Sequence, residues 1–524
     1  MGRTTIILMI ITILSKVLGF VRESAMAAFV GAGELKSVYT TAITVPTFLS
    51  GIVISGIVSG YIPIFNKVKN EEGVERAQVF TNNLLNILMI FGFVAFTISF
   101  IFARPISKAF SPGLRGDALS LAANFTRIMG LTIFTFLYSS VIRGYLNIKG
   151  NFVVPIASGV ILNIIVIITT VLYWKLDNPY VLIVGSLIGY AFQYIRFPFV
   201  AKKLGFRYKN IIDFKLGFRY KNIIDFKDKY IKELLILIVP IIISGAADQL
   251  SIIVDNSMGS AYFGQDSVSQ IYYAKTMLSF ITGVATLTIT TVTFPMIARL
   301  AQEGKIEEMK KEVASSNVLA MLIVIPATLG MMVLASPIIK LAFERNAFTS
   351  SDTMIVSSLM AAYAPYIIFV SVIKVFSNAF YSIGESKIPV LVVLIQQTIN
   401  FILNFVMIKF SGINGLAYAT SISNALGSFM IIFAFYRRFG KLTTEDNFKV
   451  ILKIAVASIA MSLVAYFIFN KLVSHLGSNI SLLIAIILSG LIYIVLVSIS
   501  KIKEVEYLKE GFLKKIKNNN WEIN

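Results

Sequence analysis

The sequence has no cysteine, a single histidine and two tryptophans among 524 residues. Without cysteine there is no disulfide framework, no thiolate metal site and no thiol nucleophile. The single histidine, His475, excludes a metal site built from several imidazoles. Charge is also scarce, because charged residues make up 14% of the chain, against about 25% in an average soluble domain. The composition therefore excludes an ordinary soluble domain.

Sequence motifs for catalysis are missing as well. The chain contains no HExxH, no G-x-S-x-G and no GxxxxGK[ST] motif. Without a phosphate-binding loop of the last kind, ATP hydrolysis within this chain cannot drive a process. We therefore predict that the protein is not an enzyme and has no resident cofactor.

Apolar residues are abundant and make up 56% of the chain. A helix needs about 20 of them to cross a membrane. We therefore predict an all-α polytopic membrane protein with about 14 transmembrane helices. The predicted spans are 4–30, 37–65, 79–103, 118–142, 152–173, 180–201, 234–260, 267–298, 313–339, 353–380, 388–408, 413–436, 450–470 and 480–500.

The basic residues fix a predicted orientation. There are 47 Lys and Arg against 27 Asp and Glu, a formal charge of +20. With both termini in the cytoplasm, 31 of the 47 lie on cytoplasmic segments, 9 on outer segments, among them Lys36, and 7 within spans. This bias is typical of a multi-pass protein of the cytoplasmic membrane. The basic residues are dispersed over many short loops, which argues against nucleic acid as a partner.

An internal repeat predicts two lobes. Residues 28–31 end the first span and are followed by Pro63 and Gly73, while residues 261–264 end the seventh span and are followed by Pro295 and Gly304. Such a repeat indicates two pseudo-symmetric six-helix lobes that rock about a cleft, plus a C-terminal helix pair. The predicted regions are an N-lobe 1–201, a basic cytoplasmic linker 202–233, a C-lobe 234–438, spans 13 and 14 within 439–500, and a basic cytoplasmic tail 501–524.

A second repeat is local, because residues 204–215 and 216–227 are both LGFRYKNIIDFK. One interpretation is a basic, aromatic segment that contacts anionic membrane lipids. The other is a neutral tandem duplication in a tolerant loop.

Ionisable residues inside spans are costly and are candidates for function. Lys16, Arg22 and Glu23 lie in the first span, Lys275 in the eighth and Lys374 in the tenth. A cleft with these cations would attract an anionic substrate such as a pyrophosphate or carboxylate. The alternatives are a structural ion pair of Glu23 with Lys16 or Arg22, and a Lys275 that reaches the membrane surface.

Oxygen-bearing side chains suggest a cation site. They are Asp248, Asp255, Asn400, Asn404, Thr420 and Ser421. Carboxylate, amide and hydroxyl oxygens suit Na⁺ better than a transition metal. Two alternatives remain open, an aspartate that carries a proton and ordinary hydrogen bonds between helices.

The residues also resemble a known family. Residues 15–23 (SKVLGFVRE), followed by residues 30–33 (VGAG), resemble the opening of the MurJ/MviN flippases of the MOP superfamily, which is related to MATE exporters and polysaccharide flippases. Residues 272–274, the 343–349 segment and the stretch from Lys374 to Pro389 resemble the same family, as do Phe152, Pro155 and Asn163. The similarity covers nearly the whole chain.

The resemblance implies a flippase for undecaprenyl-pyrophosphate-linked sugar precursors, typically the peptidoglycan precursor lipid II. It further implies alternating access driven by membrane potential or a cation gradient, in the bacterial cytoplasmic membrane. The cleft cations would meet the pyrophosphate, the last two spans would form a groove for the lipid tail, and the Leu416 carbonyl would join the sodium site. Lys16 stands where the family has arginine, and Lys275 stands where it has aspartate. Another lipid-linked surface polysaccharide, or export of small molecules as in MATE proteins, therefore remains an alternative.

Overall fold

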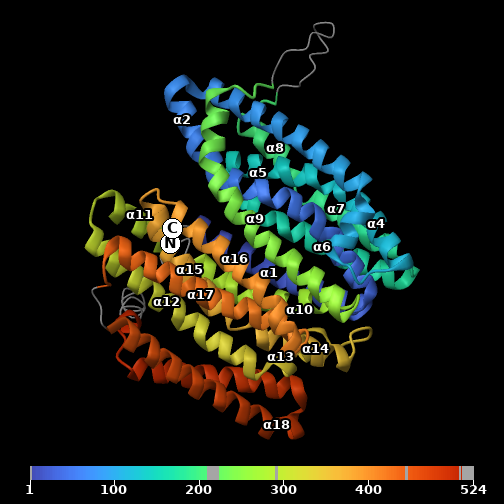
Figure 1. The fold of residues 1–524 in the computed structure, drawn as a ribbon, viewed down its shortest axis with the longest axis vertical. Coiled ribbons are helices and arrows are strands. Elements are labelled where there is room, and N and C mark those ends of the chain that lie inside the picture. The colour runs from blue at the N-terminus through green and yellow to red at the C-terminus, as the bar shows by residue number, and fades with distance from the viewer. Residues whose placement is uncertain (1–2, 209–223, 289–292, 443–445, 507–508, 510–524) are drawn as a thin grey trace. The chain divides into compact units, whose positions relative to one another are not determined.

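The computed structural model describes residues 3–208, 224–288, 293–442, 446–506 and 509. Within these residues all regular secondary structure is helical, as the sequence predicts (Figure 1). The helices are α1 (Arg3–Val30), α2 (Glu34–Ile101), α3 (Ala103–Phe110), α4 (Gly116–Gly130), α5 (Thr132–Ile148), α6 (Val153–Leu176), α7 (Pro179–Phe192), α8 (Arg196–Lys203), α9 (Lys229–Phe263), α10 (Ser267–Thr288), α11 (Phe294–Gln302), α12 (Ile306–Val333), α13 (Ala335–Phe343), α14 (Ser350–Tyr363), α15 (Tyr366–Ser382), α16 (Lys387–Ser411), α17 (Asn414–Phe439) and α18 (Asp446–Ile499).

Ten helical stretches of the described chain are long and apolar enough to cross a membrane. The protein is therefore a multi-pass membrane protein. The number of fourteen spans stays a prediction, because one of these stretches, Asn447–Ile499, contains both of the last two predicted spans. A glycine with left-handed backbone, Gly477 (φ 73°), divides that stretch.

Several predicted spans lie beside or contain a break in the helix. The predicted spans 37–65 and 79–103 lie on either side of Gly73, where α2 changes direction with a φ of 86°. The predicted spans 118–142 and 353–380 each fall within one stretch that is apolar enough to cross a membrane, and each contains a break, between α4 and α5 and between α14 and α15. Mean apolarity over a window follows where a chain crosses a membrane but does not register a change in backbone direction within an apolar run.

The backbone conformation repeats along the chain. Residues with positive φ are found at matched positions 230 to 235 residues apart. The six pairs are Gly31 and Gly264, Gly73 and Gly304, Gly116 and Asn346, Gly150 and Gly384, Asp177 and Gly412, and Gly205 and Gly440. Among the described residues the two that remain, Gly477 and Lys501, belong to the last part of the chain. The stretch from α1 to α8 is thus repeated from α9 to α17, where α10 to α12 together correspond to α2 and α17 corresponds to α7 and α8, and α18 is additional.

The chain forms two compact units, residues 1–270 with 343–349, and residues 271–342 with 350–524. The first unit has a core in which Tyr61, Phe65 and Phe80 of α2 pack with residues of α5, α8 and α9. The N-terminal end of α9 is capped by Asp228, whose carboxylate accepts from the backbone N–H groups of Tyr230 and Ile231 at 2.8 and 3.3 Å. A side-chain acceptor of this kind satisfies backbone donors that a helix start leaves unpaired.

Small residues bring α2 and α9 close together within the first unit, and the two helices run side by side in Figure 1. A methyl group added at Gly56 would lie 2.9 Å from Ile238 Cβ, and one added at Gly60 would overlap the same side chain. On α9, a methyl group added at Gly245 would lie 2.7 Å from the Oγ of Ser55 on α2. Glycines four residues apart allow helices in membranes to approach closely. We call Ser55, Gly56, Gly60, Ile238 and Gly245 the α2–α9 seam.

The 343–349 segment belongs to the first unit although its neighbours in sequence belong to the second. The Ala347 N–H donates to the Ala28 carbonyl at 3.0 Å, at the end of α1. Gly31 ends that helix with a φ of 82°, and a methyl group there would lie 2.7 Å from the Ala347 carbonyl oxygen. Glycine is required at this position both by the left-handed backbone and by the close approach.

The second unit has its own core, in which Phe376 and Phe435 of α15 and α17 pack edge to face at 5.1 Å. Ile454 and Val497 from the two arms of α18 join this core. The α18 helix folds back on itself at Gly477 (Figure 1). Most of the tandem repeat, residues 209–223, lies outside the described residues, so neither of its interpretations is tested.

The predicted lobe boundaries are not tested. The predicted second lobe begins at residue 234, whereas α9 begins at Lys229 and packs against α2 in the first unit.

Candidate functional site

A cluster of charged side chains joins α1 to α2. It consists of Arg22, Glu23 and Lys36, and we call it the Arg22 cluster. Arg22 Nη2 and Nε lie 2.6 and 3.0 Å from Glu23 Oε1, and Lys36 Nζ lies 3.3 Å from Glu23 Oε2. The Glu23 and Lys36 side chains are 5% and 1% exposed, whereas Arg22 keeps 22%. A carboxylate removed from water needs charged or hydrogen-bonding partners, and here two cations provide them. Among these three side chains positive charge is in excess.

An asparagine on α6 orients the arginine. Arg22 Nη1 donates to Asn163 Oδ1 at 3.1 Å, and Asn163 Nδ2 donates to the Ser15 carbonyl at 3.0 Å. Gly19 lies beside this amide, and a methyl group there would make an ordinary contact with Asn163 Nδ2 at 3.6 Å. The guanidinium is thus held between Glu23 and Asn163, and its exposed part is where an anion can reach it.

The predicted first-span residues are only partly brought together. Arg22 and Glu23 form an ion pair, which is one of the two pairings that the sequence left open. Lys16 is exposed on α1 and makes no hydrogen bond or ion pair within the described residues. Lys36 takes the second place beside Glu23 instead. The assignment of Lys36 to an outer loop is wrong, because it lies in the first turn of α2 with its side chain buried.

The other predicted cations belong to the second unit. Lys275 on α10 lies with its Nζ 4.9 Å from the centre of the Tyr363 ring, a cation–π contact. Lys374 is exposed on α15. Each is described within its own unit, so their grouping with Arg22 around one substrate stays a prediction.

Part of the predicted sodium set converges between α16 and α17. Asn400 Nδ2 donates to Thr420 Oγ1 at 3.2 Å, and Thr420 Oγ1 donates to the Leu416 carbonyl at 3.0 Å. Asn404, one turn along α16, is fully buried. These oxygens have the hard-donor chemistry that Na⁺ prefers. They fit the ion provided that the Asn400 amide turns its oxygen inward, since the two amide ends are nearly indistinguishable in shape.

The acidic members of that set lie on α9 in the first unit. Asp255 is fully buried there. The side chain of Asp248 lies outside the described part of the chain. Whether an aspartate completes the set stays a prediction. Within the described residues no group of three or more His, Cys, Asp or Glu side chains could hold a metal ion.

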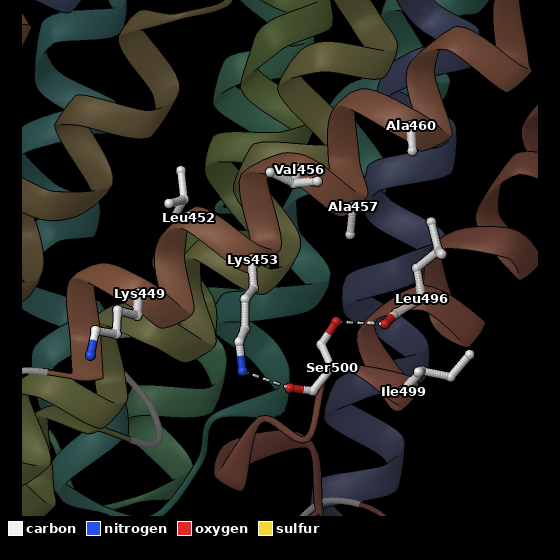
Figure 2. A pocket seen from close by; sticks show the side chains of 9 residues that line it. All are labelled: Lys449, Leu452, Lys453, Val456, Ala457, Ala460, Leu496, Ile499 and Ser500. Atoms are coloured by element: carbon white, nitrogen blue, oxygen red, sulfur yellow. Dashed lines mark hydrogen bonds between the residues drawn. The ribbon is translucent and has the colours of Figure 1, made fainter.

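The two arms of α18 enclose a pocket of about 570 Å³ (Figure 2). Apolar side chains, such as Leu452 and Val456 from the first arm and Leu496 from the second, form most of its lining. Lys453 Nζ donates to the Ser500 carbonyl at 3.0 Å. In Figure 2 Lys449 and Lys453 lie toward one end of the first arm and Ala460 toward the other. The pocket is therefore apolar along most of its lining, with basic residues toward one end.

A family model described as "Lipid II flippase MurJ" matches residues 26–488, most of the chain. The chain belongs to the MurJ family. Relatives include a probable lipid II flippase MurJ of Buchnera aphidicola subsp. Acyrthosiphon pisum (strain APS), 24% identical over 95% of this chain and 97% of that protein. Another is the probable lipid II flippase MurJ of Vibrio cholerae serotype O1, 26% identical over 80% of each chain.

The fold of this MurJ-family chain is similar to that of solved transporters. It matches the structure "Lipid II flippase MurJ, inward closed conformation" with a TM-score of 0.77 and 24% identity, over 94% of this chain and 98% of that one. It also matches an inward-facing multidrug resistance MATE family transporter of the MOP superfamily, with a TM-score of 0.67 and 15% identity, over 83% of this chain and 98% of that one. The relatives are named as flippases and transporters, not as enzymes.

Two residues of the charged cluster escaped prediction from the sequence. Lys36 stands directly before a long apolar run, where a basic residue is normally read as a membrane-surface charge. The sequence indicates Asn163 only through the family resemblance. The available signal was Glu23, because a carboxylate inside a span needs cationic partners and only one lies beside it in sequence.

Proposed function

We propose that this MurJ-family chain is a flippase that moves an undecaprenyl-pyrophosphate-linked sugar precursor, peptidoglycan lipid II in the first instance, from the inner to the outer leaflet. The bacterial cytoplasmic membrane is its proposed location, with both termini in the cytoplasm. Family membership and the names of its relatives support this proposal.

The observation that carries the proposal is the Arg22 cluster. A pyrophosphate is a compact anion whose oxygens match the forked donors of a guanidinium. Asn163 and Glu23 hold that guanidinium in place, while Lys36 offsets the Glu23 charge. A preoriented arginine loses little freedom on binding, so more of the interaction contributes to affinity.

Alternating access is the proposed mechanism, and the α2–α9 seam is the contact that it would have to open. Glycines let these helices approach closely at the seam, and apolar side chains of both helices join the same core there. Membrane potential or a cation gradient is the proposed drive, since the chain has no site for ATP hydrolysis.

Sodium is the proposed coupling ion, with Asn400, Asn404, Thr420 and the Leu416 carbonyl as ligands and an aspartate of α9 as the acidic group. When bound, Na⁺ would supply a charge that moves with the conformational change. The pocket between the α18 arms is the proposed groove for the lipid tail, which its apolar lining supports.

Depletion of the protein in the bacterium that encodes it tests the cargo. We expect lipid II to accumulate in the inner leaflet, and the cells to lyse as wall synthesis stops. Accumulation of a different undecaprenyl-linked glycan in intact cells would instead favour transport of another surface polysaccharide unit. Re-expression of the wild-type chain is the control and must reverse the accumulation.

A further inference from the structure

A polar cavity of about 450 Å³ lies in the first unit, apart from the Arg22 cluster. It is formed where the end of α5, the start of α6 and the end of α7 meet. Its lining combines three polar side chains, Arg143, Asn147 and Gln193, with the ring of Phe152 and the first turns of α6 around Gly159. The side that holds these residues is the one that the charge bias predicts to be cytoplasmic.

The three polar side chains have unused hydrogen-bonding capacity. Within the described residues, neither the Arg143 guanidinium nor the side-chain amides of Asn147 and Gln193 make a hydrogen bond or ion pair. Gln193 is 6% exposed. Buried polar groups in proteins are normally hydrogen-bonded, because desolvation without a partner is costly. An arginine and a buried amide that face one cavity without partners therefore indicate a ligand.

The cavity is connected to the Arg22 cluster along α6. Gly159 lines the cavity and contacts α1, since a methyl group there would lie 2.7 Å from Ser15 Oγ. The Ser15 carbonyl accepts from Asn163, which in turn accepts from Arg22. Gly159 and Asn163 are one helical turn apart, about 6 Å along the axis. A ligand bound to Arg22 therefore has the cavity within reach of a group attached to it.

We propose that this cavity binds the sugar portion of the lipid-linked cargo while Arg22 binds the pyrophosphate. The proposal rests on the function proposed above. Sugars present hydroxyl and acyl oxygens, which accept from the Arg143 guanidinium and from the amides, and the amide oxygens of Asn147 and Gln193 accept from sugar hydroxyls. The Phe152 ring, 43% exposed, offers an apolar surface for one face of a sugar ring.

Binding measurements with two probes separate the sugar from the phosphate. The full-length chain in detergent micelles is titrated with lipid II and, separately, with undecaprenyl pyrophosphate, which lacks sugar. We expect Arg143→Ala to weaken lipid II binding about tenfold, as loss of one charged hydrogen-bonding group does. Binding of undecaprenyl pyrophosphate is expected to stay within about twofold of wild type. Arg22→Ala is expected to weaken both.

Two further variants sharpen the test. Gln193→Ala removes no charge and is expected to weaken lipid II binding alone, which keeps the test open if Arg143→Ala does not fold. Lys149→Ala is the matched control. Lys149 is a cation that directly follows α5, the helix that carries Arg143, but its side chain does not line the cavity. It is expected to leave both affinities unchanged.

Equal weakening of both probes by Arg143→Ala would overturn the sugar assignment, since the cavity would then serve the phosphate. Unchanged lipid II binding in both Arg143→Ala and Gln193→Ala would overturn it as well. Failure of the proposed function has a different signature, because the wild-type chain then binds neither lipid, and this overturns both proposals.

Discussion

Glu23 lies between a cation from its own helix and a cation from the next one. Arg22 is partly exposed and Lys36 is buried, so the two positive charges have different surroundings. The buried one balances the carboxylate inside the protein, and the exposed one can meet a ligand. This division separates a structural role for Lys36 from a binding role for Arg22, and the two roles predict different effects of substitution.

Replacement of Arg22 by alanine is expected to lower flipping of lipid II in proteoliposomes about 10- to 100-fold, which corresponds to the loss of charged hydrogen bonds to the pyrophosphate. Arg22→Lys is expected to keep only part of the activity, since it retains the charge but not the fork. Arg127→Ala is the matched control, because Arg127 also donates to an asparagine, Asn124, at 2.8 Å. Full transport by Arg22→Ala would contradict a pyrophosphate site at this residue.

Replacement of Lys36 by methionine is expected to lower the free energy of unfolding by about 1–3 kcal/mol, because Glu23 loses a buried charged partner. Thermal unfolding in detergent measures the change. The double variant with Glu23→Gln is expected to recover most of the loss, since no buried carboxylate is then left short of partners. Lys16→Met serves as the exposed control. An unchanged melting temperature in Lys36→Met would show that the ion pair contributes nothing to stability.

The helices themselves followed closely from apolarity, and their breaks did not. A run such as 353–380 reads as one span, yet the chain ends one helix at Tyr363 and starts another at Tyr366. Breaks of this kind arise from local backbone geometry and neighbouring packing, which hydropathy does not contain. The partners within the charged cluster were equally hidden, because helix packing brings Lys36 to Glu23 over 13 residues of sequence and Asn163 to Arg22 over 141.

The α2–α9 seam predicts a crosslink. Ser55 Cβ lies 3.2 Å from the position of a Cβ on Gly245, close to the span that a disulfide bridges. The Ser55→Cys, Gly245→Cys double variant is expected to form a disulfide on oxidation, without interference because the natural chain has no cysteine. If the seam opens during transport, oxidation stops flipping and a reductant restores it.

Each single cysteine variant is the control and must be insensitive to oxidation. Quantitative crosslinking with full transport would contradict an opening of this seam during the cycle.

At the scale of the whole molecule, the repeat was visible in the sequence as a few matched Gly and Pro positions. The structure extends it to six pairs of residues with positive φ, including Asp177 and Asn346, which are not glycine. Sequence comparison between halves could not have found those two, because a left-handed backbone at aspartate or asparagine has no fixed sequence signature. The grouping of residues 343–349 with the first unit was likewise hidden.

Coupling to sodium is a property of the whole transporter. If Na⁺ binds at Thr420 and its neighbours, replacement of Na⁺ by choline in a proteoliposome assay is expected to slow flipping, and Thr420→Val is expected to remove that difference. Thr398→Val is the matched control, since Thr398 also donates to a backbone carbonyl one turn back but is exposed. Equal rates in sodium and choline for the wild-type chain would contradict sodium as the coupling ion.

The paired left-handed residues allow the same substitution to be compared between the two halves of the repeat. Gly73 and Gly304 share a conformation, with φ of 86° and 72°, and an added methyl group would meet nothing within 4 Å at either. The conformational cost of alanine is therefore nearly the same at both positions. A difference in transport rate between Gly73→Ala and Gly304→Ala then shows that the two halves contribute unequally to transport, because the local cost of replacing glycine is nearly the same in both variants.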